Sequence, residues 1–233
     1  MKISKVSIIV PCFNEKKTIK ILLDKVNKFN KFDKEIIIVD DKSTDGTREI
    51  IENDILNNYT EVKLIKHSKN KGKGAAIKTA IKEVTGEIII IQDADLEYDP
   101  SEYEKLLNPI LHRKADVVYG SRFCGGEQRI HLFWHKLANN FLTLLCNILT
   151  NLNLSDMETC YKVFKTEIIK KIDLKENRFG IEPELTIKLA REKSIFYEVC
   201  ISYYGRSYDE GKKIGFKDGL AAIYCILRYS LFK

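Results

Sequence analysis

The sequence predicts an α/β fold in which a mostly parallel β-sheet carries helices on both faces. Short apolar runs alternate along the chain with segments whose apolar residues recur at helical spacing. This order is typical of sheets built from strand–helix units. The runs are also apolar throughout rather than at every second position. Strands of that kind are buried on both faces, which favours parallel pairing.

Five strands are predicted in the first half of the chain, at residues 6–10, 35–40, 62–65, 87–91 and 116–120. Two of the intervening segments place apolar residues on one helical face, at 19, 22, 23, 26 and 29 and at 76, 77, 80, 81 and 84. A further helix is predicted to begin after Asp99, which would cap it, because Pro100 and Glu102 follow at its first and third positions.

The pattern changes beyond about residue 125, where two amphipathic helices are predicted at 131–150 and 216–232. In the second helix one face collects Phe216, Leu220, Ile223, Tyr224, Leu227 and Leu231. This helix could pack on the sheet or lie on a membrane surface, and both readings stay open. No membrane-spanning helix is predicted, because asparagines interrupt the uncharged stretch 137–155.

The composition fits one compact domain with a C-terminal extension. The chain has 233 residues, of which 44% are hydrophobic and 31% charged, which is enough for a sizeable core. Its net charge of +6 fits nucleic acid, anionic lipid, phosphorylated substrates or simply a solvated surface. The six cysteines are scattered without a CxxC pair, and the N-terminal apolar run is too short for a secretory signal. We therefore expect reduced cytosolic thiols rather than disulfides.

Four acidic residues follow the most apolar run of the chain. Ile88–Ile91 is followed by Asp93, Asp95, Glu97 and Asp99 at alternate positions. Ligands collect at the carboxyl ends of parallel strands, so this cluster lies where a site is expected. Crowded carboxylates resist ionisation unless a cation compensates them, and Mg²⁺ or Mn²⁺ prefers such oxygen ligands.

Polar segments also follow the other predicted strands, at 10–15, 39–47 and 67–77. The last one places Lys71, Gly72, Lys73 and Gly74 directly before a helix N-terminus, where backbone amides and ammonium groups favour an anion. The segment lacks the GK[ST] ending of a P-loop, and the chain has no GxGxxG motif, so a dinucleotide-binding fold has no support.

The motifs "VSIIVPCFNE", "IIIVDDKSTDGT", "NKGKGAAIKTA", "GEIIIIQDADLEYDP" and "VVYGSRF" together resemble family 2 glycosyltransferases with the GT-A fold. Within that family they resemble the dolichyl- or polyprenyl-phosphate mannosyl- and glucosyltransferases. The resemblance covers residues 6–123 and, more loosely, 179–190 and 205–219. It implies a GT-A catalytic domain at 1–215 followed by a C-terminal amphipathic helix at 216–233.

The resemblance further implies an inverting hexosyltransferase. Its donor would be a UDP- or GDP-hexose carrying mannose or glucose, and its acceptor a polyprenyl or dolichyl phosphate. Mg²⁺ or Mn²⁺ would be the cofactor, and nucleic acid would not be a partner. The implied location is peripheral, on the cytoplasmic face of a membrane.

On the donor side, the residues expected to bind the nucleotide sugar are Pro11, Phe13, Asn14, Glu15, Asp40, Asp41, Ser43, Gly72 and Lys73. Phe13 stands where the family usually has tyrosine. Asp93 and Asp95 would bind the metal that bridges the donor diphosphate, with Glu97 as a third ligand where relatives often carry glutamine.

On the acceptor side, Arg122 would approach the phosphates, and Arg206, Lys212 and Lys213 would bind the acceptor phosphate. Asp156 is a further catalytic candidate. The segment "DMETCYKVF" at 156–164 departs from the usual D-x-x-S-G-F-[KR] pattern, which leaves the roles of Asp156 and Glu158 open.

Three alternatives are weaker. A related transferase with a soluble glycan acceptor would need a general base and no basic acceptor cluster. A sugar nucleotidyltransferase would need a GxGTR-type N-terminal loop, and "VPCFNE" stands there instead. A non-catalytic membrane-surface scaffold would not need the Asp93/Asp95 pair, and nucleotide turnover would distinguish it.

Overall fold

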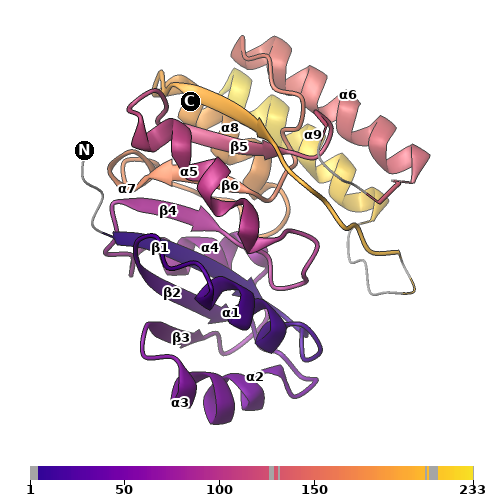
Figure 1. Cartoon of the computed structure of the whole chain (residues 1–233). Coiled ribbons are helices and arrows are strands. Elements are labelled where there is room, and N and C mark those ends of the chain that lie inside the picture. The colour runs from indigo at the N-terminus through magenta and orange to yellow at the C-terminus, as the bar shows by residue number, and fades with distance from the viewer. Residues whose placement is uncertain (1–4, 126–128, 131, 208, 210–214, 233) are drawn as a thin grey trace.

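The structure of the protein is a computed structural model, which describes residues 5–125, 129–130, 132–207, 209 and 215–232. One seven-stranded sheet runs through it in the order β3-β2-β1-β4-β6-β5-β7, and helices cover both of its faces (Figure 1). The predicted α/β fold with a mostly parallel sheet is confirmed.

The five predicted strands are all present. They are β1 (Lys5–Cys12), β2 (Asp33–Asp40), β3 (Val62–Lys66), β4 (Ile88–Ile91) and β5 (Val117–Ser121). β1 pairs in parallel with both β2 and β4, and β2 pairs in parallel with β3. All four residues of β4 are buried, as its four isoleucines predict.

Two strands were not predicted from the sequence. β6 (Lys162–Lys165) is antiparallel and lies between β4 and β5, while β7 (Phe196–Cys200) pairs in parallel with β5 at the edge of the sheet. β6 has only four residues, two of them lysines, and no residue of β7 is fully buried. Neither segment is apolar throughout, so the pattern that found the first five strands misses both.

The predicted helices correspond to α1 (Ile19–Asn27), α4 (Lys73–Ile81), α5 (Tyr103–Leu111), α6 (Phe133–Thr150) and α9 (Phe216–Leu231). A 3₁₀ turn, η2 (Pro100–Glu102), precedes α5, and the Asp99 carboxylate accepts a hydrogen bond from the Ser101 amide at 2.9 Å. The predicted N-cap is therefore confirmed. The remaining elements are α2 (Thr47–Ile50), the π-helical turn η1 (Ile51–Ile55), α3 (Leu56–Asn58), α7 (Thr166–Ile169) and α8 (Ile181–Arg191).

The sheet separates two apolar cores. α1, η1 and α5 pack on one face, where Leu22, Ile55 and Leu106 are buried, and α4, α6, α8 and α9 pack on the other. Alternate residues of each central strand supply the two cores, so Ile8 points into the first and Ile9 into the second. Burial on both faces is the physical reason that these strands are apolar throughout.

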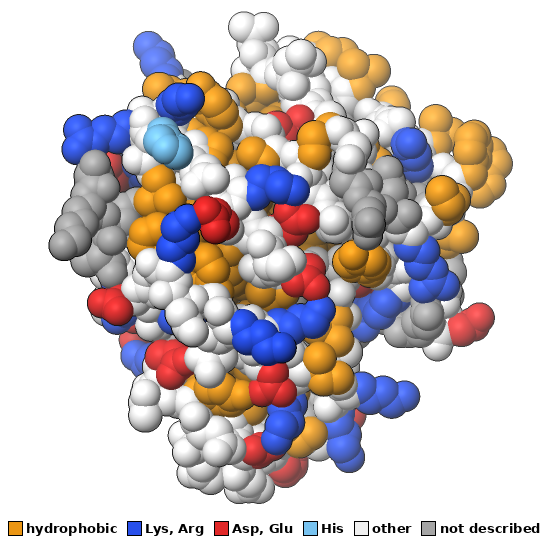
Figure 2. Space-filling view, viewed as in Figure 1, with side chains coloured by type: hydrophobic (Ala, Val, Ile, Leu, Met, Phe, Trp, Pro, Cys, Tyr) orange, Lys and Arg blue, Asp and Glu red, His pale blue; other side chains and the backbone are white. Residues whose placement is uncertain are grey.

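α6 and α9 pack on the sheet with one face and expose large apolar side chains on the other. On α6, Phe133 and Trp134 are 70% and 74% exposed, and on α9, Tyr224 and Leu231 are 62% and 63% exposed. Figure 2 shows hydrophobic side chains gathered at the upper right, over α6. Within the described residues, no helix is long and apolar enough to cross a membrane.

Candidate active site

The loops after β1, β2 and β4 meet at the carboxyl edge of the sheet. The Asp41 amide donates to the Cys12 carbonyl at 2.8 Å, and the Gln92 amide donates to the Ile9 carbonyl at 2.9 Å. These parallel-ladder bonds hold the ends of β2 and β4 against β1, so the three following loops lie at the same edge of the sheet. The acidic cluster, the segment 10–15 and the segment 39–47 therefore share one site, as the sequence predicts.

Asp93 lies beside a buried lysine from α4. The Lys73 ammonium is 2.9 Å from the Asp93 carboxylate and 3.2 Å from that of Glu182 on α8. It also contacts the Cys160 sulfur at 2.9 Å. Burial is the largest single effect and opposes ionisation of Asp93. The Lys73 charge, a hydrogen bond from Cys160 and the Arg206 charge together still hold the pKa of Asp93 below its ordinary value. The predicted donor residue Lys73 thus belongs to the same cluster as Asp93.

Asp95 lies beside Arg206. Its carboxylate is 2.7 Å from the Arg206 guanidinium, which also contacts Glu97 at 3.3 Å and Glu15 at 3.4 Å. Burial, followed by the charges of Asp93 and Glu97, raises the pKa of Asp95 to about 7. One guanidinium therefore does not compensate three converging carboxylates, and the site favours additional positive charge.

The predicted metal ligands fit a hard divalent cation by their chemistry. Asp93 and Asp95 are largely buried carboxylates, and burial together with neighbouring carboxylates raises the pKa of Asp95, so a divalent cation there would find hard oxygen ligands. Among the described residues, no group of three or more His, Cys, Asp or Glu side chains is arranged to hold a metal ion. Lys73 and Arg206 form ion pairs with these carboxylates instead. Metal binding by Asp93, Asp95 and Glu97 therefore stays a prediction.

Glu97 fixes the segment that carries Arg206. Its carboxylate accepts hydrogen bonds from the Tyr203 hydroxyl at 2.7 Å and from the Arg206 amide at 2.9 Å. Its carbonyl accepts one from the Tyr204 amide at 3.0 Å. In this conformation Glu97 is thus a structural partner of residues 203–206. Lys212 and Lys213, predicted to bind acceptor phosphate with Arg206, lie outside the described residues.

The loop after β1 is fastened to the loop after β2. The Asn14 amide donates to the Ser43 hydroxyl at 3.0 Å, and the Thr44 amide donates back to the Asn14 side chain at 2.8 Å. Asn14 has a φ of 53°, a left-handed conformation that asparagine tolerates better than most residues. Pro11 pairs with Val39 in the sheet, and Phe13 is half-buried next to Asn14. The predicted nucleotide-pocket residues are therefore held together by short contacts.

Asp40 and Asp41, predicted to hold the base and ribose, are both buried and already engaged. Asp40 accepts a hydrogen bond from Arg48 Nε at 2.7 Å. Asp41 accepts hydrogen bonds from the amides of Lys71 at 2.9 Å and Gly72 at 2.7 Å, and its Oδ1 lies 2.6 Å from His67 Nδ1. These contacts fix the segment before α4. Whether either carboxylate also binds the nucleotide stays a prediction.

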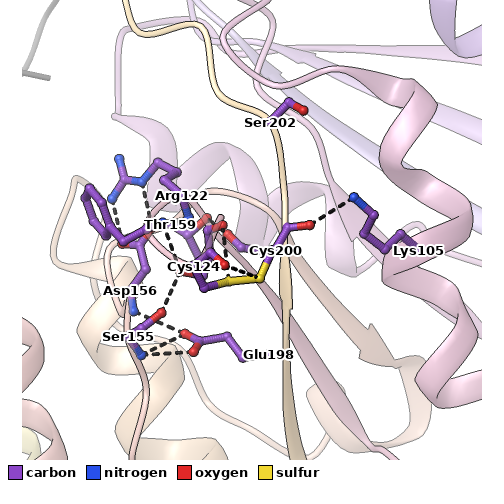
Figure 3. Close-up of a disulfide and its surroundings, with 12 residues drawn as sticks. Lys105, Arg122, Cys124, Ser155, Asp156, Thr159, Glu198, Cys200 and Ser202 are labelled. Atoms are coloured by element: carbon purple, nitrogen blue, oxygen red, sulfur yellow. Dashed lines mark hydrogen bonds and ion pairs between the residues drawn. A yellow bond between two sulfur atoms is a disulfide. The ribbon is translucent and has the colours of Figure 1, made fainter. Parts of the chain in front are cut away.

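Arg122, directly after β5, forms a two-pronged ion pair with Asp156. Its Nε and one terminal nitrogen each lie 2.7 Å from a different Asp156 oxygen (Figure 3). A terminal nitrogen also donates to the Asn139 side chain on α6 at 3.1 Å. Glu198 on β7 accepts hydrogen bonds from the amides of Ser155 at 2.9 Å and Asp156 at 3.1 Å, which places the Asp156 loop. Asp156 therefore orients Arg122.

Cys124 and Cys200 form a disulfide, which contradicts the expectation of reduced thiols (Figure 3). Ser121 lies opposite Cys200 in the β5–β7 register, so the chain needs only three further residues to bring Cys124 onto the end of β7. The 76 residues between the two cysteines hide this proximity in the sequence. The other four cysteines, Cys12, Cys146, Cys160 and Cys225, are thiols.

A second group of buried charges lies next to the site, and sequence reasoning named only its member Glu158, with the role left open. Glu158, Lys162 and Glu182 lie behind Lys73, and burial together with the Glu182 charge raises the pKa of Glu158 to about 8. One oxygen of Glu158 and one of Glu182 are buried without a hydrogen-bond partner among the described residues. The only signal in the sequence was the loose resemblance of 179–190, which did not single out Glu182.

The protein is an enzyme of the glycosyltransferase class with the GT-A fold. The chain belongs to glycosyl transferase family 2, because the model of that family matches residues 7–173, more than half of its length.

Three curated relatives cover most of the chain. A dolichol-phosphate mannosyltransferase of Pyrococcus furiosus is 29% identical over 91% of the chain and 60% of its own length, so the chain spans less than two thirds of that relative. An uncharacterised protein of Methanocaldococcus jannaschii is 28% identical over 97% of the chain and 92% of its own length. A dolichyl-phosphate β-glucosyltransferase of Trichomonas vaginalis is 27% identical over 97% and 73%.

Solved structures confirm the fold. Glucosyl-3-phosphoglycerate synthase from Mycobacterium tuberculosis, in complex with Mn²⁺, uridine diphosphate and glucosyl-3-phosphoglycerate, superposes with a TM-score of 0.75. The two sequences are 16% identical, and the matched region comprises all of this chain and 81% of the mycobacterial chain. The same enzyme has also been solved with Mg²⁺ and uridine diphosphate.

Proposed function

We propose that this glycosyltransferase moves one hexose, mannose or glucose, from a UDP- or GDP-sugar to a polyprenyl or dolichyl phosphate, with inversion at C1. The names of the Pyrococcus and Trichomonas relatives support a lipid phosphate acceptor. The complexes of the mycobacterial enzyme support a nucleotide-sugar donor and a divalent ion. We further propose that the protein works peripherally, at the cytoplasmic face of a membrane.

One observation carries this proposal. Arg122, the cation predicted to approach the phosphates, contacts Asn139 on α6, and the outer side of α6 exposes Phe133, Trp134 and Phe141. Large apolar side chains that are exposed next to one another are typical of a surface that contacts another molecule or a membrane. A phosphate held near Arg122 and an apolar chain lying along α6 would match the two parts of a prenyl phosphate.

Transfer would proceed by attack of an acceptor phosphate oxygen on C1 of the sugar. The C1–O bond to the donor diphosphate breaks, and the nucleoside diphosphate leaves with the bond's electron pair. A phosphate monoester has its second pKa near ~6, so at neutral pH it is largely a dianion and needs no general base. It needs positioning and charge compensation, which Arg122 and Arg206 would provide.

Asp93, Asp95 and Glu97 would hold Mg²⁺ or Mn²⁺, an ion that supplies Lewis-acid stabilisation of the departing diphosphate. A cation bound by these carboxylates would weaken the ion pair between Arg206 and Asp95. Arg206 would then be able to turn toward the acceptor phosphate. Lys73 would remain between Asp93 and Glu182 and keep the Asp93 carboxylate ionised.

The test is a donor screen of UDP- and GDP-hexoses with Mg²⁺ or Mn²⁺ and a short polyprenyl phosphate. Parallel reactions contain phosphoglyceric acid or a soluble glycan as the acceptor. Formation of a glycolipid in at least one reaction is the expected result. Product only with a soluble acceptor would replace the lipid by that acceptor, while hexose transfer as such would stand.

A further inference from the structure

A cavity of about 620 Å³ lies between α9 and the segment 175–180 that precedes α8. Ala221, Cys225 and Arg228 line it from α9, at a spacing that places them on one helical face. Lys71 lines it from the segment before α4. None of the residues predicted to bind donor or metal lines this cavity, so it is separate from the site described above.

Positive charge dominates the lining. Four basic residues line the cavity, and only two acidic ones do. The basic residues are Lys71, Lys175, Arg178 and Arg228, and the acidic residues are Glu176 and Asp218. The Asp218 carboxylate accepts a hydrogen bond from the Gly215 amide at 2.9 Å at the start of α9. Glu176 accepts one from the Tyr229 hydroxyl at 2.7 Å and lies 3.6 Å from Arg228. Both acids therefore have structural partners.

Lys71 and Arg178 differ from the other cations. Within the part of the chain that the structure describes, no carboxylate pairs with either side chain, and both are exposed. Two uncompensated cations that face one cavity favour an anion there, and a guanidinium in particular matches the geometry of phosphate oxygens.

An apolar surface borders the cavity. Leu220, Tyr224 and Leu227 each stand one residue away from a lining position of α9, about 100° around the helix. They are 52%, 62% and 40% exposed. A ligand that places an anionic group between Lys71 and Arg178 can therefore lay an apolar substituent along this side of α9.

The cavity wall also packs against the donor side of the site. A β-carbon at Gly72 would collide with the Asn177 carbonyl, and one at Gly74 would lie 2.6 Å from the Glu176 carbonyl. Only glycine permits this approach. The same segment donates the Lys71 and Gly72 amides to Asp41 and leads into Lys73. A ligand in the cavity would therefore contact the element that positions Lys73.

We propose that this cavity is a phosphomonoester-binding site, distinct from the transfer site, in which Lys71, Arg178 and Arg228 contact the phosphate. The ligand source is either a lipid phosphate or a free soluble phosphate, since both present the same group. The inference does not depend on which acceptor the enzyme uses.

The experiment measures shielding of Lys71 from an amine-acylating reagent by mass spectrometry, in the intact chain, with exposed Lys82 as the internal reference. The probes are farnesyl phosphate below its micelle concentration, farnesol and inorganic phosphate. The variants are Arg178→Gln and Arg178→Lys, and Lys171→Gln is the matched control because it removes an exposed charge elsewhere on the surface.

Farnesyl phosphate is expected to slow acylation of Lys71 several-fold without affecting Lys82, and farnesol is expected to have no effect. Arg178→Gln should raise the half-saturating concentration by about tenfold or more, since a charge-assisted hydrogen bond to phosphate is lost. The half-saturating concentration of Arg178→Lys should lie between those of the wild type and Arg178→Gln, and that of Lys171→Gln should equal the wild-type value.

Inorganic phosphate identifies the source. Equal shielding by inorganic and farnesyl phosphate supports the site with a soluble ligand, and stronger shielding by farnesyl phosphate supports it with a lipid ligand. Three results would each overturn the proposal: no shielding by any phosphate, equal shielding by farnesol, or shielding that Arg178→Gln leaves unchanged.

Discussion

The two halves of the sheet are assembled in different ways. Around β1, β2 and β3, the loops that follow neighbouring strands meet over short sequence distances: Asn14 contacts Ser43 at a separation of 29 residues, and Asp41 contacts Gly72 at 31. At the end of β4 and between β5 and β7, the same edge is closed by distant segments: Arg206 reaches Asp95 over 111 residues, and Cys200 reaches Cys124 over 76. The nucleotide pocket is thus a local construction, whereas the acidic cluster after β4 is completed by segments far away in the sequence.

The two halves also treat charge differently. On the donor side, backbone amides and Arg48 satisfy the carboxylates of Asp40 and Asp41. On the acceptor side, the insertion of β6 buries charged side chains of Glu158 and Lys162, and the pKa values of both are displaced by burial. Substitutions in the first half should therefore act mainly on turnover, whereas those in the second should act on stability as well.

The largest effect is expected from Asp95→Asn on the donor side. Loss of a carboxylate that holds the compensating cation should lower kcat by about 10²–10³-fold with little change in unfolding free energy. Transfer of radiolabelled hexose measures the effect, and Asp33→Asn, an exposed carboxylate at the start of β2, is the control. Full wild-type activity in excess chelator would contradict the metal role of this half.

The second effect tests the long-range closure. Cys124→Ser should lower the free energy of unfolding by about 2–4 kcal/mol, because the disulfide closes a 76-residue loop. Urea unfolding with and without a reductant measures it. The reductant should destabilise the wild type to the level of the variant and leave the variant unchanged. If the reductant left the urea midpoint of the wild type unchanged, the two cysteines would not form a disulfide in solution.

Arg206→Ala should rank third. It removes a guanidinium proposed to compensate the acceptor phosphate, so kcat/KM for lipid phosphate should fall about 10–100-fold. Glu158→Gln and Asp156→Asn should lower kcat less, after circular dichroism has established that each variant is folded. If Asp156→Asn were inactive and Arg206→Ala normal, a general-base mechanism with a hydroxyl acceptor would be required.

The last effect concerns stability alone and depends on pH. Burial and Glu182 raise the pKa of Glu158 from 4.5 to about 8 in the folded protein. The folded state thus binds this proton more tightly, and the group's contribution to stability falls as pH rises from about 4.5 to 8. Glu158→Gln should gain stability relative to wild type at pH 9 and gain little at pH 5. If the unfolding free energies of the wild type and Glu158→Gln changed with pH in parallel, burial would not have raised the pKa of Glu158.

The donor half was predictable because its signals are local. A strand such as β4 is apolar throughout, and the residues that follow it directly are the ones at the site. Nothing local indicates β6, a four-residue antiparallel strand, or the pairing of Cys124 with Cys200, since both depend on which strands become neighbours in the sheet. The Lys73–Glu182 contact is hidden for the same reason, because its partners lie on two different helices.

The predicted division of the chain at residue 216 stays a prediction. The helix named there exists as α9, but its inner residues Ala222 and Ile226 belong to the core on the second face of the sheet. Sequence periodicity identified an amphipathic helix and left open which side it would bury. The structure shows that one face packs on the protein while the other carries exposed apolar residues.

Trp134 is the only tryptophan of the chain, and α6 holds it 74% exposed beside Phe133. All indole emission of the protein therefore originates from the surface where a bilayer is proposed to lie. Transfer of that ring from water into lipid would shift the emission to shorter wavelength and protect it from aqueous quenchers. The native chain thus carries its own optical reporter at one defined point, and no label is needed to follow its attachment to vesicles.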